Sequence, residues 1–291
     1  MIGMKFSTKP LHDKFGLLVT DIDLSLPLPE VMPDQLDELL SIHGVLLFRK
    51  QLLGEEDLIR FAGGFGALET TIYTKGVSPT NKEVIYISNL KYPDGSNVGL
   101  LGDQEVDWHS DQTYRSNPAT GAMLYGLEVP TTSGRTYWAN QYLAYEMLPQ
   151  EVKDKIDGRS GVFSYAKRLE VFYGKDQKND KQLTQRAPEL ALHPIVLTHP
   201  VSKRKALYAD PVTLLEIEGM PRSESDSILS VLNKACSIPS VIYEHHWQQG
   251  DLVFWDNGCT LHKRDPIASD HARFMKRMTI HMRPANHCLP H

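Results

Sequence analysis

Short segments rich in β-forming residues dominate this chain, and turn residues bound most of them. They are residues 84–87, 122–129, 136–139, 194–198, 252–255 and 278–282. Helical patterns are fewer, and they fall after Pro33 and at 55–61, 142–157 and 223–236. A parallel α/β fold would need strands that alternate regularly with helices, and this chain lacks that alternation. The pattern therefore predicts a mainly β protein, a double-sheet jelly roll with flanking helices.

The bulk properties indicate a soluble cytoplasmic protein with one domain. The chain has 291 residues, no internal repeat and a formal net charge of −5, so no broad basic surface invites nucleic acid. Its three cysteines are too few and too scattered for a disulfide framework. The first ten residues lack the apolar core of a secretory signal, and no apolar run is long enough to span a membrane. We therefore expect a single domain over residues 1–291, in which any anionic substrate would need a local basic pocket.

The triplet His109-Ser110-Asp111 is the sharpest local feature. Residues two apart on a strand point to the same face, so His109 and Asp111 could hold one metal ion. Two histidines and one carboxylate leave three positions open on iron, which suits a non-haem Fe(II) oxygenase. His262 has the best context for the third ligand, because it comes just past the apolar segment 252–255. The neighbours His245 and His246 would face opposite ways on a strand and are poor candidates.

Two arginines follow His262 at a spacing that favours an anion. Arg273 and Arg277 are four residues apart, so on a strand they point to one face. Burying two guanidinium groups is costly without anions to pair with them. A dicarboxylate co-substrate would offset that cost by bidentate pairing.

With these residues together, the chain resembles the taurine dioxygenase/chlorophenoxyacetate dioxygenase (TauD/TfdA) family of 2-oxoglutarate-dependent oxygenases. The resemblance extends from about Phe15 to Arg283. The segments that carry it are residues 44–49, 65–69, 87–89, 108–111 and 134–136 and the C-terminal block 255–277. It implies a double-stranded β-helix of the cupin-like kind. It also implies Fe(II), 2-oxoglutarate and dioxygen as cofactors.

The resemblance also implies a role for each candidate residue. His109, Asp111 and His262 would bind iron, and Thr136 and Arg273 would bind the distal carboxylate of 2-oxoglutarate. The substrate anion would contact Arg277, with Lys75 and Asn89 as further contacts. Arg135 stands where family members usually carry an acidic residue, and we expect its side chain to point away from the pocket.

The implied reaction is hydroxylation of an unactivated C–H bond of a small organic acid, such as an aryloxyalkanoate or sulfonate, with release of succinate and carbon dioxide. Related halogenases lack the carboxylate ligand, so Asp111 favours hydroxylation. Three alternatives stay open: a desaturase or cyclase acting on a biosynthetic intermediate, a metal-dependent hydrolase and a non-catalytic sensor. Self-association and a lid role for the polar segment 175–182 are open as well.

Overall fold

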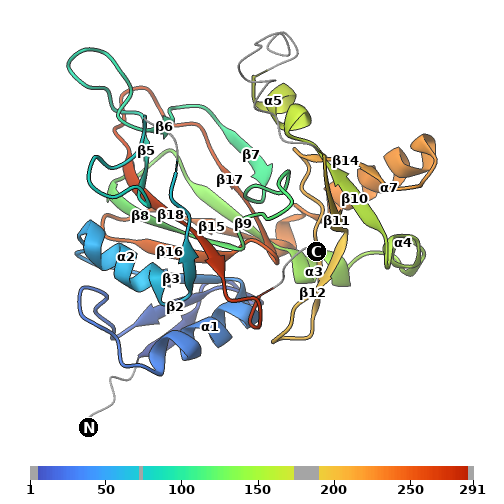
Figure 1. Ribbon diagram of the computed structural model, residues 1–291, viewed down its shortest axis with the longest axis horizontal. Coiled ribbons are helices and arrows are strands. Elements are labelled where there is room, and N and C mark those ends of the chain that lie inside the picture. The colour runs from blue at the N-terminus through green and yellow to red at the C-terminus, as the bar shows by residue number, and fades with distance from the viewer. Residues whose placement is uncertain (1–5, 72–74, 174–189, 288–291) are drawn as a thin grey trace.

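A nine-stranded, mostly antiparallel sheet forms one wall of the computed structural model, which describes residues 6–71, 75–173 and 190–287 (Figure 1). In spatial order this major sheet contains β1 (Ser7–Pro10), β2 (Leu17–Thr20), β3 (Val45–Phe48), β16 (Leu252–Asp256), β8 (Gly121–Glu128), β18 (Phe274–Met282), β5 (Ile85–Ser88) and β6 (Leu100–Leu101), while β4 (Gly66–Leu68) pairs with β18 beside this path.

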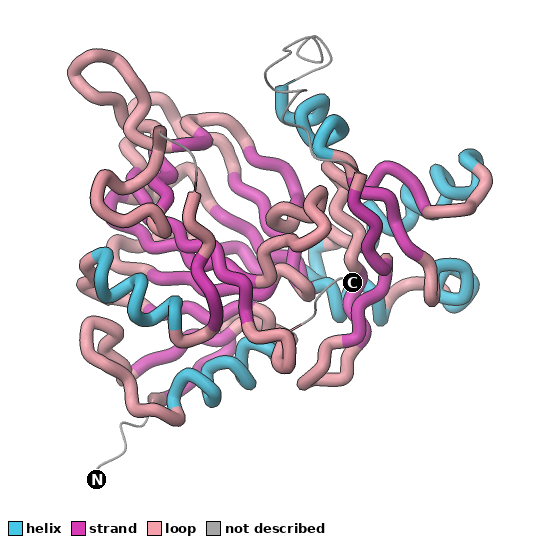
Figure 2. Tube along the Cα trace, viewed as in Figure 1, coloured by secondary structure: helices cyan, strands magenta, loops and turns pink. Residues whose placement is uncertain are grey.

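The opposing minor sheet contains β15 (Ile242–His245), β9 (Thr136–Asn140), β17 (Thr260–Arg264) and β7 (Val106–His109) in that order. Smaller antiparallel groups lie beyond it: β11 (Ala191–Pro194), β10 (Ser160–Phe163) and β14 (Leu214–Ile217) form one, and β12 (Val196–Thr198) and β13 (Lys205–Leu207) form the other. The helices are α1 (Met32–His43), α2 (Glu55–Gly63), α3 (Gln141–Glu146), α4 (Gln150–Ile156), α5 (Tyr165–Tyr173), α7 (Arg222–Ala235) and the 3₁₀ turn η2 (Pro239–Val241) (Figure 2).

The central strands of the major sheet are buried on both faces. Leu47 and Val253 are cross-strand partners and pack toward the minor sheet, in the core that also contains Trp138. Their neighbours Leu46 and Phe254 point the other way, into the core beneath α1 and α2. Alternate residues of these strands therefore pack into two different cores. Both faces are buried, which is why the sequences of these strands are continuously apolar.

Helix α1 is fixed by its apolar face and its end. Leu36 and Leu40 are fully buried against the major sheet, and Pro33 lies in the first turn. Gly44 ends the helix at φ 72°, a left-handed conformation that favours glycine. A Cβ at Gly44 would also lie 2.9 Å from the Thr260 methyl carbon, so close packing against β17 requires glycine too.

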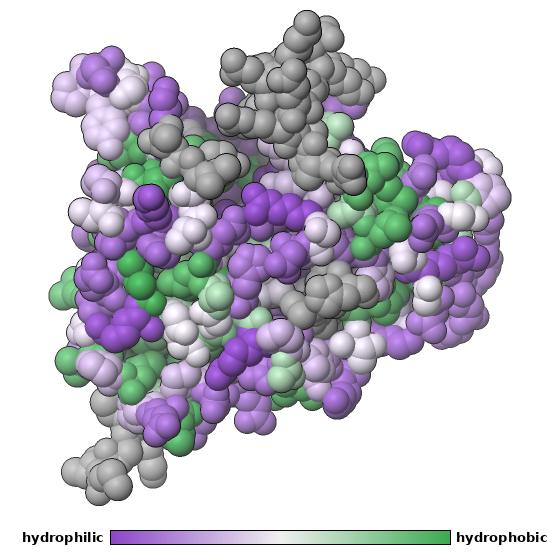
Figure 3. All heavy atoms as spheres, viewed as in Figure 1, coloured by the Kyte–Doolittle hydropathy of each residue, from purple (hydrophilic) through white to green (hydrophobic). Residues whose placement is uncertain are grey.

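The predicted mainly β fold with flanking helices, a double-stranded β-helix, is confirmed by this sheet pair. One strand prediction needs correction, because residues 194–198 belong to two strands: β11 ends at Pro194 and β12 begins at Val196. The segment 175–182 lies outside the described residues. Among the described helices, none has the length and apolar character needed to cross a bilayer. Hydrophilic residues cover most of the face in Figure 3, with smaller hydrophobic areas between them.

Candidate metal and co-substrate site

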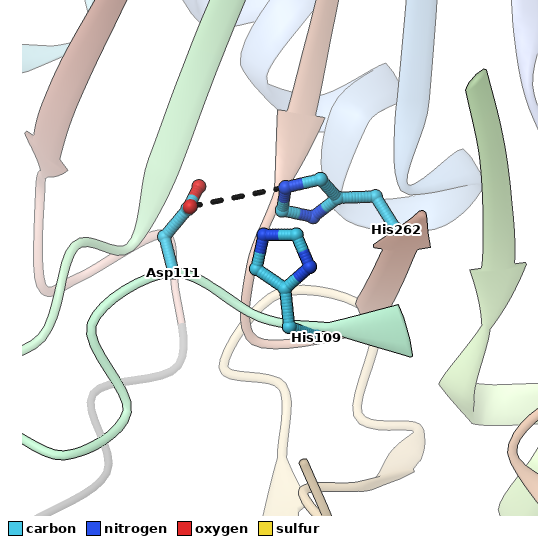
Figure 4. Close-up of side chains that lie close together, drawn as sticks. All are labelled: His109, Asp111 and His262. Atoms are coloured by element: carbon cyan, nitrogen blue, oxygen red, sulfur yellow. Dashed lines mark ion pairs between the residues drawn. The ribbon is translucent and has the colours of Figure 1, made fainter. Parts of the chain in front are cut away.

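Three predicted ligands converge where the minor sheet faces the major sheet (Figure 4). His109 is the last residue of β7 and His262 lies in the middle of β17, and the two are direct cross-strand partners. Their ring centroids are 4.1 Å apart. Asp111 follows in the turn after β7, and its Oδ1 lies 3.8 Å from Nε2 of His262. One potential ligand atom from each residue lies within 4.8 Å of the others, so the three can share one ion.

Pairing between strands explains why these three residues meet better than the two-residue spacing of His109 and Asp111 does. We expected His109 and Asp111 to share the face of one strand, but the strand ends at His109. We also placed His262 just past a strand, whereas it lies inside β17. Register pairs the two histidines, and the turn after β7 returns the carboxylate to them.

Hydrogen bonding and burial prepare both histidines for a metal. The carbonyl oxygen of Asp107 lies 2.7 Å from Nδ1 of His109 and can only accept a hydrogen bond, so Nδ1 carries the ring proton. The unprotonated Nε2 is then the atom that can bind a metal. Burial lowers the pKa of His109 well below its usual value. Burial lowers the pKa of His262 to about 4, although the Asp111 charge opposes this shift. Both rings are therefore neutral at physiological pH, the state that binds metals.

Asp111 is held in its charged form by Arg277. Burial alone would raise the pKa of Asp111, but the guanidinium of Arg277 and the neighbouring histidines outweigh burial and hold the pKa below its usual value. Nη2 of Arg277 lies 2.7 Å from Oδ2 of Asp111. An anionic carboxylate and two neutral imidazoles make a donor set that suits a divalent transition metal.

A small cavity of about 50 Å³ adjoins the ligands and contains the predicted co-substrate residues. Thr136, Arg273 and Arg277 line it together with His109 and His262. Arg273 is 1% exposed, and burial lowers the pKa of its guanidinium well below the usual value. Nε and Nη1 of Arg273 have no hydrogen-bond partner among the described residues. Orphaned donors of this kind call for an anion, and a carboxylate fits them.

A larger cavity of about 380 Å³ opens on the other side of the metal cluster. His109, Asp111 and Arg277 line it as well, so the cluster lies between the two spaces. The other walls mix aliphatic and aromatic side chains with charged ones of both signs, among them Ile85, Ile87, Leu100, Leu101, Leu169, Tyr114, Tyr165, Arg115, Arg168, Glu69 and Glu105, of which Arg115 and Glu69 form an ion pair. The chamber therefore suits a molecule with an apolar body and an anionic end.

Two predicted substrate contacts, Asn89 and Lys75, are not among the described residues that line these cavities. Asn89 uses its amide elsewhere: Nδ2 donates to Asp103 and to the carbonyl of His271, and Oδ1 accepts from the backbone N–H of Arg273. It therefore positions the segment that carries Arg273. Lys75 is exposed.

Arg135 behaves as predicted and points out of the site. Its Nη1 lies 2.8 Å from Oε1 of Glu244, and both side chains are exposed. The acidic-to-basic change before Thr136 therefore leaves the charge of the co-substrate cavity unaltered.

The sequence analysis missed two residues at this cavity: Arg264, which lines it, and Trp247, which hydrogen-bonds a residue that lines it. Trp247 donates its indole N–H to Oγ1 of Thr136 over 2.9 Å. Arg264 lies two residues after His262 on β17 and lines the cavity. Spacing of two on a strand places Arg264 on the face of His262, but only the register of β17 against β9 places it opposite Thr136.

A second group of two histidines and one carboxylate, His199, Asp256 and His287, lies buried elsewhere in the described chain. Its hydrogen bonds argue against a metal. Nδ1 of His199 accepts from the backbone N–H groups of Val201 and Ser202, so Nε2 carries the proton. His287 contacts a carboxylate with each nitrogen, Asp256 at 2.8 Å and Asp37 at 2.5 Å, so both nitrogens donate. Neither ring offers a lone pair, and the group is a buried ionic clamp.

Comparison with known proteins identifies the family to which the chain belongs. The family model described as "Taurine catabolism dioxygenase TauD, TfdA family" matches residues 7–279. The chain is 30% identical to the alpha-ketoglutarate-dependent 2,4-dichlorophenoxyacetate dioxygenase of Cupriavidus pinatubonensis, over 95% of this chain and 98% of the relative. It is 27% identical to pentalenolactone F synthase of Streptomyces avermitilis, over 93% and 92%. A solved structure, AAD-2 in complex with Mn(II) and N-oxalylglycine, matches with a TM-score of 0.79 and 28% identity, over 95% of this chain and 97% of that one.

A double-stranded β-helix with two histidines and a carboxylate at its open side defines a non-haem metal oxygenase. The chain belongs to the TauD/TfdA family and is a 2-oxoglutarate-dependent dioxygenase. Its cofactors are Fe(II), 2-oxoglutarate and dioxygen, and the residues fit them: the ligand set is complete, and the buried donors of Arg273 await a carboxylate.

Proposed function

We propose that this enzyme hydroxylates an unactivated C–H bond of a small organic acid, an aryloxyalkanoate or a sulfonate. The likeness to a 2,4-dichlorophenoxyacetate dioxygenase and to the alpha-ketoglutarate-dependent sulfonate dioxygenase of Saccharomyces cerevisiae supports this class of substrate. The match to the family model over residues 7–279 supports treating residues 1–291 as one dioxygenase domain.

One observation carries the proposal: Arg277 lines both cavities and contacts Asp111. A cation at that point can neutralise a substrate anion in the larger cavity while it orients the carboxylate ligand. Tyr114 and Tyr165 lie farther along the same cavity, with ring centroids 4.6 Å apart. An aryl or alkyl body can therefore pack on the apolar wall while its acid group faces Arg277.

In this assignment His109, Asp111 and His262 hold the iron, and Thr136 and Arg273 hold the distal carboxylate of 2-oxoglutarate. When bound, iron and 2-oxoglutarate together activate dioxygen for attack on a C–H bond, and 2-oxoglutarate is converted to succinate and carbon dioxide.

The protein's own task is placement and exclusion of water. Trp255 is 2% exposed and lies 5.0 Å from the ring of His262, centroid to centroid, so it shields that ligand from the core side. The hydroxyl of Thr136 accepts from Trp247 and keeps its own proton to donate into the cavity. Arg277 fixes the orientation of Asp111, and both side chains line the larger cavity.

The test is anaerobic addition of Fe(II) and 2-oxoglutarate to the apoprotein, followed by visible absorption. We expect the charge-transfer band of a 2-oxo acid chelated to ferrous iron. Organic acids are then screened for stimulated succinate release, each beside its uncharged amide. Acids should stimulate release and their amides should not; equal stimulation by both would remove Arg277 as the anion contact.

A second outcome has one observation in its favour, the 27% identity to pentalenolactone F synthase. The same ligands and co-substrate could serve a desaturation or a ring closure on a biosynthetic intermediate. Product analysis separates the two: hydroxylation adds one oxygen atom to the substrate, whereas desaturation removes two hydrogen atoms.

A further inference from the structure

Arg264 is buried in the co-substrate cavity, although none of the roles above requires it. It is 5% exposed and is the direct cross-strand partner of Thr136. Thr136 and Arg273 line the same small cavity. Together with Arg277, three guanidinium groups and one hydroxyl therefore line a space of about 50 Å³.

The donors of Arg264 divide into two sets. Nη2 donates to the carbonyl oxygen of Leu101 over 2.9 Å and also contacts the carbonyl oxygen of Gln104. Nε and Nη1 have no hydrogen-bond partner among the described residues, as is true of the same two atoms of Arg273. Within the described chain, no carboxylate lies within ion-pair distance of either guanidinium group, although Asp103 acts on Arg264 at longer range. Two buried cations with spare donors are costly unless an anion joins them.

We infer that Arg264 is a second guanidinium for the distal carboxylate of 2-oxoglutarate, and that it links this carboxylate to the turn formed by residues 101–104. The inference rests on the proposed co-substrate role of Thr136 and Arg273. Arg264 acts on the co-substrate with Nε and Nη1, and on the turn with Nη2.

The turn is placed to carry this link to the substrate. Leu101 lines both cavities, and Gln104 lines the larger one. Leu101 has a φ of 65°, a left-handed conformation that disfavours a leucine, so its carbonyl bond to Arg264 helps to hold it there. An anion that fixes Arg264 therefore also fixes part of the substrate wall, and bound 2-oxoglutarate prepares the larger cavity.

The first test measures binding rather than turnover. Mn(II)-loaded wild type, Arg264→Met, Arg264→Lys and the outward-facing control Arg135→Met are titrated with 2-oxoglutarate by calorimetry. The same proteins receive 2-oxopentanoate, which has a methyl group in place of the distal carboxylate. Arg264→Met should bind 2-oxoglutarate about 10–100-fold more weakly, since one charge-assisted contact is lost. Arg264→Lys, which keeps a charge without the fork, should lose less, and Arg135→Met should match wild type.

Comparing 2-oxoglutarate with 2-oxopentanoate distinguishes loss of a direct contact to the distal carboxylate from a general disturbance of the site. Affinity for 2-oxopentanoate should be the same in wild type and both Arg264 variants. Unchanged affinity for 2-oxoglutarate in Arg264→Met, or an equal loss for both ligands, would overturn the contact. If the wild type binds no 2-oxoglutarate in the presence of metal, the co-substrate assignment and this inference fail together. If wild type and Arg264→Met bind 2-oxoglutarate equally well, the contact from Arg264 is wrong but the co-substrate role of Thr136 and Arg273 stands.

The link to the turn has its own readout, which is amide hydrogen exchange. In Mn(II)-loaded wild type, saturating 2-oxoglutarate should slow exchange in residues 100–105. In Arg264→Met at saturating ligand, that slowing should be absent while residues 252–256 remain protected. Equal exchange in residues 100–105 with and without 2-oxoglutarate in wild type would overturn the link.

Discussion

Arg277 and Asp111 bring the two sheets together at the metal site, with 2.7 Å between Nη2 and Oδ2. Asp111 belongs to the turn after β7 of the minor sheet, whereas Arg277 lies on β18 of the major sheet. The carboxylate ligand is thus the only one of the three outside a strand, and a charge from the opposite sheet fixes it.

Asp111→Ala should abolish substrate-dependent succinate release and weaken Mn(II) binding. Changes to groups that only orient a ligand cost about 10–100-fold in metal affinity, so loss of the ligand itself should cost no less. Asp107→Ala is the matched control, because that side chain is exposed and only its backbone carbonyl contacts His109. Metal affinity equal to wild type would exclude Asp111 from the site.

Arg273→Ala should raise the 2-oxoglutarate concentration needed for half-maximal activity and leave metal binding intact. The lost charge-assisted pair should cost on the order of several kcal/mol, because the co-substrate carboxylate would be buried without its main partner. Titration of Mn(II)-loaded protein with N-oxalylglycine measures the loss directly. Arg135→Ala, which removes an exposed arginine of the minor sheet, should bind the analogue normally. An Arg273 variant with normal affinity would contradict the assignment.

Trp247→Phe should weaken binding of N-oxalylglycine although Trp247 is not among the residues that line the cavity. The substitution keeps an aromatic ring and deletes the N–H that orients Thr136, and a neutral hydrogen bond contributes about 1 kcal/mol. Thr136→Val should weaken binding too, and the double variant should lose less than the sum of the two. Additive losses would mean that Trp247 acts independently of the threonine.

Stability should fall as pH rises through about 9, because of the buried clamp around His287. Burial disfavours the charged ring, but Asp256 and Asp37 outweigh burial and raise the pKa of His287 to about 9. The raised pKa stabilises the fold fully below the ordinary value of about 6.5, and that contribution, on the order of 3 kcal/mol, is lost as pH rises through the folded value. Denaturant unfolding from pH 6 to 10 measures it.

His287→Gln provides the control for this pH dependence. It removes the titrating ring, so its stability should vary much less between pH 6.5 and 9 than that of wild type. The exposed His246, changed to Gln, should retain the wild-type profile. A wild-type profile that is flat in this range would contradict the charged clamp.

Residue type and order were enough to select His109, Asp111 and His262 as candidate ligands. The structure brings His109, Asp111 and His262 together and places Arg273 in the adjoining cavity, but it does so through strand register and a turn rather than through spacing along one strand. The turn that holds Asp111 was missed, because a three-residue spacing does not say where a strand ends. Asn89 was misassigned for a similar reason: its partners at Asp103 and His271 are distant in sequence.

Arg264 and Trp247 were beyond the sequence reading for a different reason. Their importance comes from pairing between strands, Arg264 with Thr136 by register and Trp247 with the same threonine by a hydrogen bond. Register between strands far apart in sequence is a tertiary property, and hydrophobic pattern alone fixes it only loosely. The fold class needed no such information, because short β-rich segments sufficed.

The direct pairing of His109 with His262 has a further consequence, since β7 is the edge strand of the minor sheet. A metal ion held by both rings would act as a cross-strand staple between that edge and its neighbour. Metal binding would then also stabilise the pairing of the edge strand β7 with β17. Metal depletion should accordingly leave residues 106–109 as the first part of the barrel to fray.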